Sequence, residues 1–115
     1  MINRFRLSMA ATVLILPLTA SAHAKLLGTS PSAGATLAAA PKELRLDFNE
    51  SVQLAVLKMS AAGKQISLPY DRATSASHVV VPLPVLGAGT YQVSWSALTV
   101  DDGHVVKGSF SFQIE

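Results

Sequence analysis

The chain has 115 residues, of which half are hydrophobic and only 14% are charged, and its formal net charge is +2. This length predicts a single domain. The sequence contains no cysteine, which excludes thiolate catalysis, disulfide bonds and metal sites built on cysteine. It also contains no nucleophile elbow, phosphate-binding glycine loop or HExxH motif, so no common hydrolytic or nucleotide-binding site is indicated.

Residues 1–22 have the pattern of a secretory signal peptide. Two arginines lie within the first six residues, residues 7–20 are apolar and uncharged, and Ala20-Ser21-Ala22 supplies a small-x-small cleavage pattern. The apolar run is shorter than the ~20 residues that span a bilayer, although a retained membrane anchor is the alternative interpretation. Cleavage after Ala22 would leave seven basic and seven acidic residues. That balance leaves no basic patch for nucleic acid.

Beyond residue 22, apolar and polar residues alternate with a period of two, which is typical of half-buried strands. Turn-forming residues such as those at 87–89 and 102–103 separate the alternating runs. Residues 33–40 are expected to form a helical turn at most. Seven runs are predicted as strands: 25–29, 43–48, 54–59, 64–68, 77–81, 90–97 and 107–114. Seven short strands predict an all-β, immunoglobulin-like Greek-key sandwich or barrel.

His23 directly follows the predicted cleavage site. If cleavage falls there, this residue offers two nitrogen donors to one metal, its free α-amine and its imidazole. Cu(II) favours such nitrogen and oxygen ligands in a tetragonal arrangement. The alternative is a polar residue that follows the cleavage site by chance.

Asp102 and His104 have the spacing i, i+2, which places two side chains on the same face of an extended segment. One carboxylate oxygen and one imidazole nitrogen would complete a set of three nitrogens and one oxygen with His23. The alternative is a polar hairpin turn, because Asp-Gly is a common turn pair.

Other residues carry weaker indications. Glu50 is either an acceptor or outer ligand beside the metal or a solvated strand residue. His78 alternates with apolar neighbours and is expected to face solvent without a metal role. Met59 and Trp95 are expected in the core.

Four motifs follow one another along residues 23–115. They are His23-Ala24-Lys25-Leu26 with Ser30-Pro31-x-x-Gly34-Ala35, then Leu44-Arg45-Leu46-Asp47-Phe48-Asn49-Glu50-Ser51-Val52, then Gly89-Thr90-Tyr91-Gln92-Val93-Ser94-Trp95, and finally Asp102-Gly103-His104 with Gly108 and Phe110-Ser111-Phe112. In this order they resemble the CopC family of periplasmic copper-binding, copper-resistance proteins. Four ordered motifs are a more specific signal than any one of them.

The resemblance implies a seven-stranded Greek-key β-barrel or sandwich that binds one Cu(II) ion per chain at one end. Matched motif by motif, the ligands it implies are His23, Asp102 and His104, with Glu50 nearby. It also implies a periplasmic role in copper handling beside an inner-membrane partner of the CopD type.

The chain departs from the family pattern in two places. The segment between Trp95 and His104 is one residue longer than the common spacing, so Asp101 is an alternative ligand to Asp102 and otherwise a neighbour of the site. The methionine-rich loop with which some members bind Cu(I) is missing, because Met59 is the sole methionine after residue 22. A separate Cu(I) site is therefore not implied, although His78 lies in that part of the chain.

Copper binding without catalysis is the function that these features favour. The first alternative is a copper-dependent oxidative enzyme, because an N-terminal histidine chelate also occurs in enzymes that cleave polysaccharides. The second alternative is a structural or adhesion sandwich that binds no metal.

Overall fold

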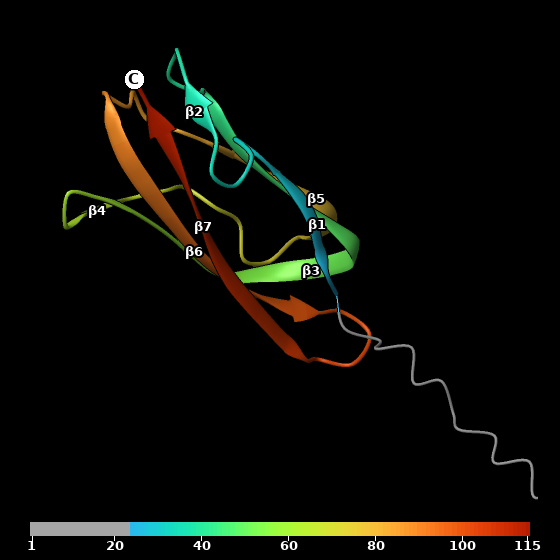
Figure 1. Ribbon diagram of the computed structural model, residues 1–115. Coiled ribbons are helices and arrows are strands. Elements are labelled where there is room, and N and C mark those ends of the chain that lie inside the picture. The colour runs from blue at the N-terminus through green and yellow to red at the C-terminus, as the bar shows by residue number, and fades with distance from the viewer. Residues whose placement is uncertain (1–23) are drawn as a thin grey trace, which may run out of the picture.

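The computed structural model describes residues 24–115, so the predicted signal peptide and His23 lie outside the described residues. The described chain is all-β, with seven strands, as predicted (Figure 1). None of its residues forms a helix that could cross a membrane. The strands are β1 (Leu26–Ser30), β2 (Thr36–Leu37), β3 (Glu43–Ala61), β4 (Lys64–Ile66), β5 (Ser75–Pro82), β6 (Gly89–Thr99) and β7 (Val105–Ile114).

The long strand β3 organises the sheet. Its first half pairs with β1 and β5, and its second half pairs with β4 and β6, all antiparallel. The strand order along the main path is β1-β3-β6-β7-β2, with β2 parallel to β7. Figure 1 shows β3 turning from one group of partners toward the other. The fold is therefore the predicted all-β architecture, while its Greek-key and immunoglobulin-like description stays a prediction.

Two predictions about the elements were wrong. The separate strands expected at 43–48 and 54–59 are one strand. The backbone between them stays extended because Asn49 is bound to Lys25, just before β1, while Val52 and Gln53 pair with β5 and β6. The helical turn expected within residues 33–40 is absent. The backbone there is bound to β7 instead, with Gly34 N donating to Ser111 O at 2.7 Å and Gln113 N donating to Ala35 O at 2.8 Å.

The core collects the inward residues of the alternating strands. Met59 and Trp95 are buried in it, as predicted. The Trp95 ring meets Phe48 edge to face, with centroids 5.2 Å apart, and it lies over Gly108, where an added Cβ would come within 2.9 Å of the indole. The buried apolar residues are Ala24, Leu44, Leu46, Phe48, Val52, Leu54, Leu57, Met59, Leu68, Val81, Leu86, Tyr91, Val93, Trp95, Ala97, Phe110, Phe112 and Ile114.

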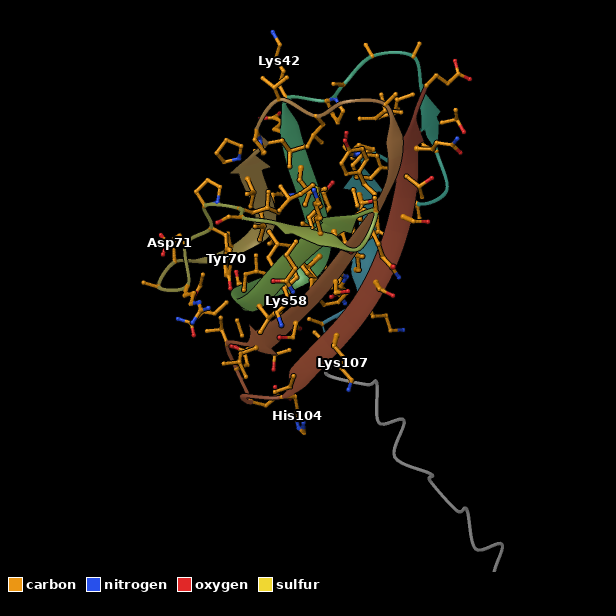
Figure 2. All side chains as sticks on the ribbon, turned by 90° about the vertical axis from the view of Figure 1, so that its left-hand side faces the viewer. Lys42, Lys58, Tyr70, Asp71, His104 and Lys107 are labelled. Atoms are coloured by element: carbon orange, nitrogen blue, oxygen red, sulfur yellow. The ribbon has the colours of Figure 1, made fainter. Side chains whose placement is uncertain are left out.

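One end of the molecule brings together the start of the described chain and the β6–β7 loop (Figure 1, Figure 2). Ala24 is buried in the core. The next residue, Lys25, is bound to Asn49 of β3 through Lys25 N to Asn49 Oδ1 at 2.6 Å and Asn49 N to Lys25 O at 3.0 Å. Val100 of the loop donates its N–H to Ser51 O at 3.4 Å. The segment Asn49–Ser51 therefore connects residue 25 with the loop.

Candidate metal centre

The loop between β6 and β7 carries Asp102 and His104. It is closed by two backbone hydrogen bonds, from Thr99 N to His104 O at 2.9 Å and from Gly103 N to Thr99 O at 3.0 Å. Gly103 has φ of +68°, a conformation that glycine adopts without steric cost. The two candidate ligands therefore lie in a turn and not on the extended segment that the i, i+2 argument assumed. The same residues, 102–104, therefore form the polar turn and carry the two candidate ligands, so the two predicted alternatives do not exclude each other.

The side chains of Asp102 and His104 nevertheless converge. His104 Nε2 lies 3.6 Å from Asp102 Oδ2, and the two side chains are 57% and 30% exposed, respectively. Metal bonds of histidine nitrogen and carboxylate oxygen are about 2.0–2.2 Å long, so two donors on one ion lie roughly 3–4 Å apart. The pair thus has the spacing and the solvent access that a shared ion requires.

A network around the turn fixes this pair. Asp102 Oδ1 accepts hydrogen bonds from the Thr99 hydroxyl and from His104 N, the latter at 3.2 Å. His104 N also approaches Thr99 Oγ1 at 3.0 Å. Thr99 is buried, whereas both candidate ligands reach the surface. Thr99 could not be selected from the sequence, because its contacts with the two candidate ligands depend on how the turn closes.

The other predicted site residues lie at the same end. Asp101 is an exposed residue of the same turn. Glu50 is half-buried in β3, between Asn49, which holds Lys25, and Ser51, which holds the loop. Within residues 24–115, no three histidine, aspartate or glutamate side chains are grouped closely enough to hold a metal. The predicted third ligand, His23, lies outside the described residues.

A second histidine–aspartate contact, which sequence reasoning missed, lies on β3 and β5. Asp47 Oδ1 accepts hydrogen bonds from Arg45 Nε at 2.8 Å and from His78 Nδ1 at 2.6 Å. The Arg45 guanidinium, and then His78, lower the pKa of the Asp47 carboxyl below its ordinary value. His78 is 61% exposed, which confirms its predicted orientation toward solvent. Asp47 and His78 are 31 residues apart in sequence, so only the register in which β3 and β5 pair could have revealed their contact.

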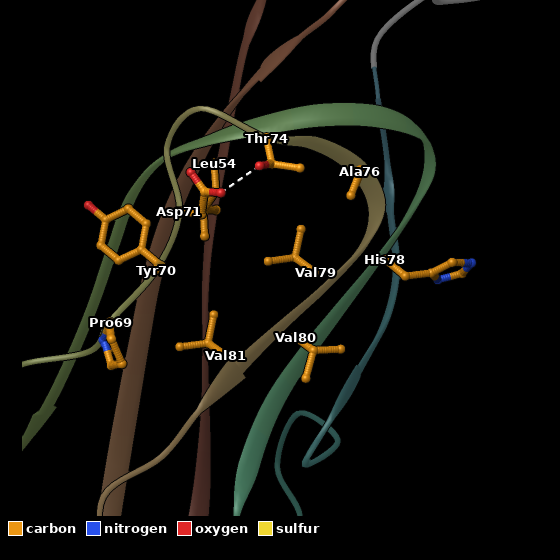
Figure 3. A pocket seen from close by; sticks show the side chains of 10 residues that line it. All are labelled: Leu54, Pro69, Tyr70, Asp71, Thr74, Ala76, His78, Val79, Val80 and Val81. Carbon is orange, nitrogen blue, oxygen red and sulfur yellow. Dashed lines mark hydrogen bonds between the residues drawn. The ribbon is translucent and has the colours of Figure 1, made fainter.

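The hollow beside β5 offers no comparable ligand group. His78 borders it but points away from it (Figure 3). Asp71 also borders it, and its carboxylate accepts hydrogen bonds from Thr74 Oγ1 at 2.5 Å and from Ala73 N at 2.7 Å. The hydrogen bond to Thr74 is the main reason that the pKa of Asp71 is lowered. Asp71 therefore orders its own loop.

Comparison with known proteins identifies the family. A family model described as the CopC domain matches residues 26–115, a range that includes the β6–β7 loop and begins after His23. Protein YobA of Escherichia coli (strain K12) is 33% identical over 118 residues, which cover 97% of this chain and 94% of that protein.

Two solved structures have the same fold. The crystal structure of CopC from Methylosinus trichosporium OB3b matches with a TM-score of 0.67 and 31% identity, covering 81% of this chain and 94% of that one. PcoC, described as a methionine-rich copper resistance protein from Escherichia coli, matches with a TM-score of 0.66 and 27% identity, covering 82% of this chain and all of that one. With most of its length matched by the family model, the chain belongs to the CopC family.

Proposed function

We propose that this protein binds one Cu(II) ion in the periplasm and acts in copper resistance, either by chelating the ion or by carrying it to an inner-membrane partner of the CopD type. The proposed ligands are His23, Asp102 and His104. The observation that carries the proposal is the pair of donors at the β6–β7 turn, with His104 Nε2 and Asp102 Oδ2 3.6 Å apart.

The start of the described chain supports His23 as the missing donor. Ala24 is buried and Lys25 is held by two hydrogen bonds to Asn49, at the end of the molecule that carries the turn. Covalent geometry keeps the Cα of residue 23 about 3.8 Å from that of Ala24. Cleavage after Ala22 would give His23 a free α-amine beside its imidazole, so one residue would supply two nitrogens.

The donor chemistry favours Cu(II). Two imidazoles, an amine and a carboxylate are borderline or hard donors, and a tetragonal set of nitrogen and oxygen is typical of Cu(II). Cu(I) prefers soft sulfur ligands. The sole methionine of residues 24–115, Met59, is fully buried in the core, and the whole chain lacks cysteine. These available donors therefore favour Cu(II) over Cu(I).

Titration with both oxidation states tests the proposed function. We expect protein that begins at His23 to bind one equivalent of Cu(II), with the tetragonal signature in electron paramagnetic resonance of nitrogen and oxygen ligands. The same protein should lose Cu(I) to strong Cu(I) chelators. Absence of Cu(II) binding would favour a metal-free structural domain, and tight Cu(I) binding would contradict the donor assignment.

Substitution of the two neighbouring aspartates tests which of them is the ligand. Asp102→Ala should change the Cu(II) spectrum and weaken binding, because it removes the oxygen beside His104 Nε2. Asp101→Ala removes a side chain of the same charge from the same turn and should leave the spectrum close to wild type. The opposite order of effects would mean that the additional residue of this loop has moved the ligand to Asp101.

We infer binding rather than catalysis from the surroundings of the turn. A carboxylate ligand leaves less room for a substrate at the copper. Apart from half-buried Tyr70, the aromatic side chains of residues 24–115 lie in the core, so the described surface has no flat aromatic platform for a polysaccharide. Copper-loaded protein should therefore produce little peroxide with ascorbate, and sustained copper-dependent production would favour the oxidative enzyme.

A further inference from the structure

Among residues 24–115, Thr99 is the one buried residue that is neither apolar nor aromatic, with 2% of the residue exposed. It is the last residue of β6 and continues the inward series of that strand after Trp95 and Ala97. An apolar residue would be the ordinary choice at such a position, because a buried hydroxyl costs free energy unless it is hydrogen-bonded. The bonds that Thr99 makes are therefore informative.

The Thr99 hydroxyl connects the two proposed ligands. A threonine hydroxyl has one proton to donate and two lone pairs to accept with. Here it donates to Asp102 Oδ1 and accepts from His104 N at 3.0 Å. The Thr99 backbone adds a second connection, since its N–H donates to His104 O at 2.9 Å. One buried residue thus holds the carboxylate of Asp102 and both the N–H and the C=O of His104.

We propose that Thr99 is a positioning residue that sets the ligand pair in place before the metal binds. It acts through Asp102 and His104 and does not itself contact the ion, so the proposal rests on the proposed function. With Oδ1 held by the hydroxyl, the carboxylate is oriented so that Oδ2 lies 3.6 Å from His104 Nε2. Ordering these groups in the metal-free protein removes an entropy cost from the binding step.

Thr99 also determines which aspartate is presented. Its hydroxyl bonds to Asp102, three residues along the chain, while Asp101 lies exposed in the turn. The additional residue of this loop is thereby accommodated without loss of the Asp-x-His pair. The Thr99 hydroxyl thus orients the carboxylate of Asp102 toward the proposed site through a hydrogen bond that Asp101 does not make in the structure.

The test compares Thr99→Val with Thr99→Ser in protein that begins at His23. Valine keeps the shape and removes the hydroxyl, so Cu(II) affinity should fall about 10–100-fold, as is typical when a group that orients a ligand is removed. The paramagnetic resonance spectrum of the bound ion should also change. Serine keeps the hydroxyl and should restore both properties. Thr90→Val, at the exposed opposite end of β6, is the matched control and should have no effect.

Hydrogen exchange of the metal-free wild-type protein gives a readout that does not depend on copper or on a stable variant. The His104 amide should exchange slowly although its residue lies in an exposed turn, because it is bonded to the Thr99 hydroxyl and to Asp102 Oδ1, which that hydroxyl holds. Thr99→Val, if it folds, should expose that amide to faster exchange. Fast exchange in the wild type, or unchanged Cu(II) affinity and spectrum in Thr99→Val, would overturn the role of Thr99. If the wild type binds no Cu(II) at all while the amide is protected, the proposed function fails instead.

Discussion

His104→Ala should weaken Cu(II) binding severely, by more than the roughly 10–100-fold that follows the loss of a group behind a ligand. The substitution removes an imidazole nitrogen from the proposed set and leaves Asp102 as the sole proposed ligand on the β6–β7 turn. Competition titration against a Cu(II) chelator measures the loss. Thermal unfolding of the metal-free variant should change little, because the His104 side chain is 57% exposed.

His78→Ala is the matched control for this substitution. It also removes one exposed imidazole that approaches an aspartate, with His78 Nδ1 2.6 Å from Asp47 Oδ1. His78 lies on β5, which pairs with β3 and not with the strands that carry the turn. Its loss should leave Cu(II) affinity close to wild type. If the two alanine variants bind Cu(II) equally well, the assignment of His104 is wrong.

Local alternation was sufficient to predict most strands. In β6, the inward residues from Tyr91 to Ala97 alternate without interruption, and the predicted strand differs from the observed one by one residue at its start and two at its end. β3 was divided in the prediction because polar residues occupy 49–51. Its backbone stays extended there because Asn49 and Ser51 are hydrogen-bonded to Lys25 and Val100, which come from distant parts of the chain. The parallel pairing of β2 with β7 likewise joins residues far apart in sequence.

The candidate site was only partly predictable for the same reason. The convergence of Asp102 and His104 was predicted from their separation of two residues, although the turn that brings them together is not the extended segment assumed. Their role as ligands stays a prediction. Thr99 was not found. The inward alternation of β6 extends to it, but nothing in its sequence neighbourhood shows that its hydroxyl bonds to that turn. The contact of Asp47 with His78 depends on strand register, which alternation alone does not set.

Processing at the N-terminus should have the largest effect on metal binding. The α-amine of His23 exists only after cleavage behind Ala22. A free α-amine loses its proton near neutral pH, so Cu(II) can displace it at modest cost. An additional residue in front of His23 converts that amine into an amide, a far poorer donor, and the chelate loses one of its two nitrogens. The core does not depend on that amine, so stability without metal should be unaffected.

The most direct test of a copper site built on the N-terminal histidine is therefore a competition titration of two proteins. One begins at His23 and the other carries one additional methionine before it. Their thermal unfolding without metal should coincide. Their Cu(II) affinities should differ by more than the roughly 10–100-fold expected for a change outside the ligands. Equal affinities would show that the N-terminal amine is not a ligand, and the proposed chelation of copper by His23 would then be wrong.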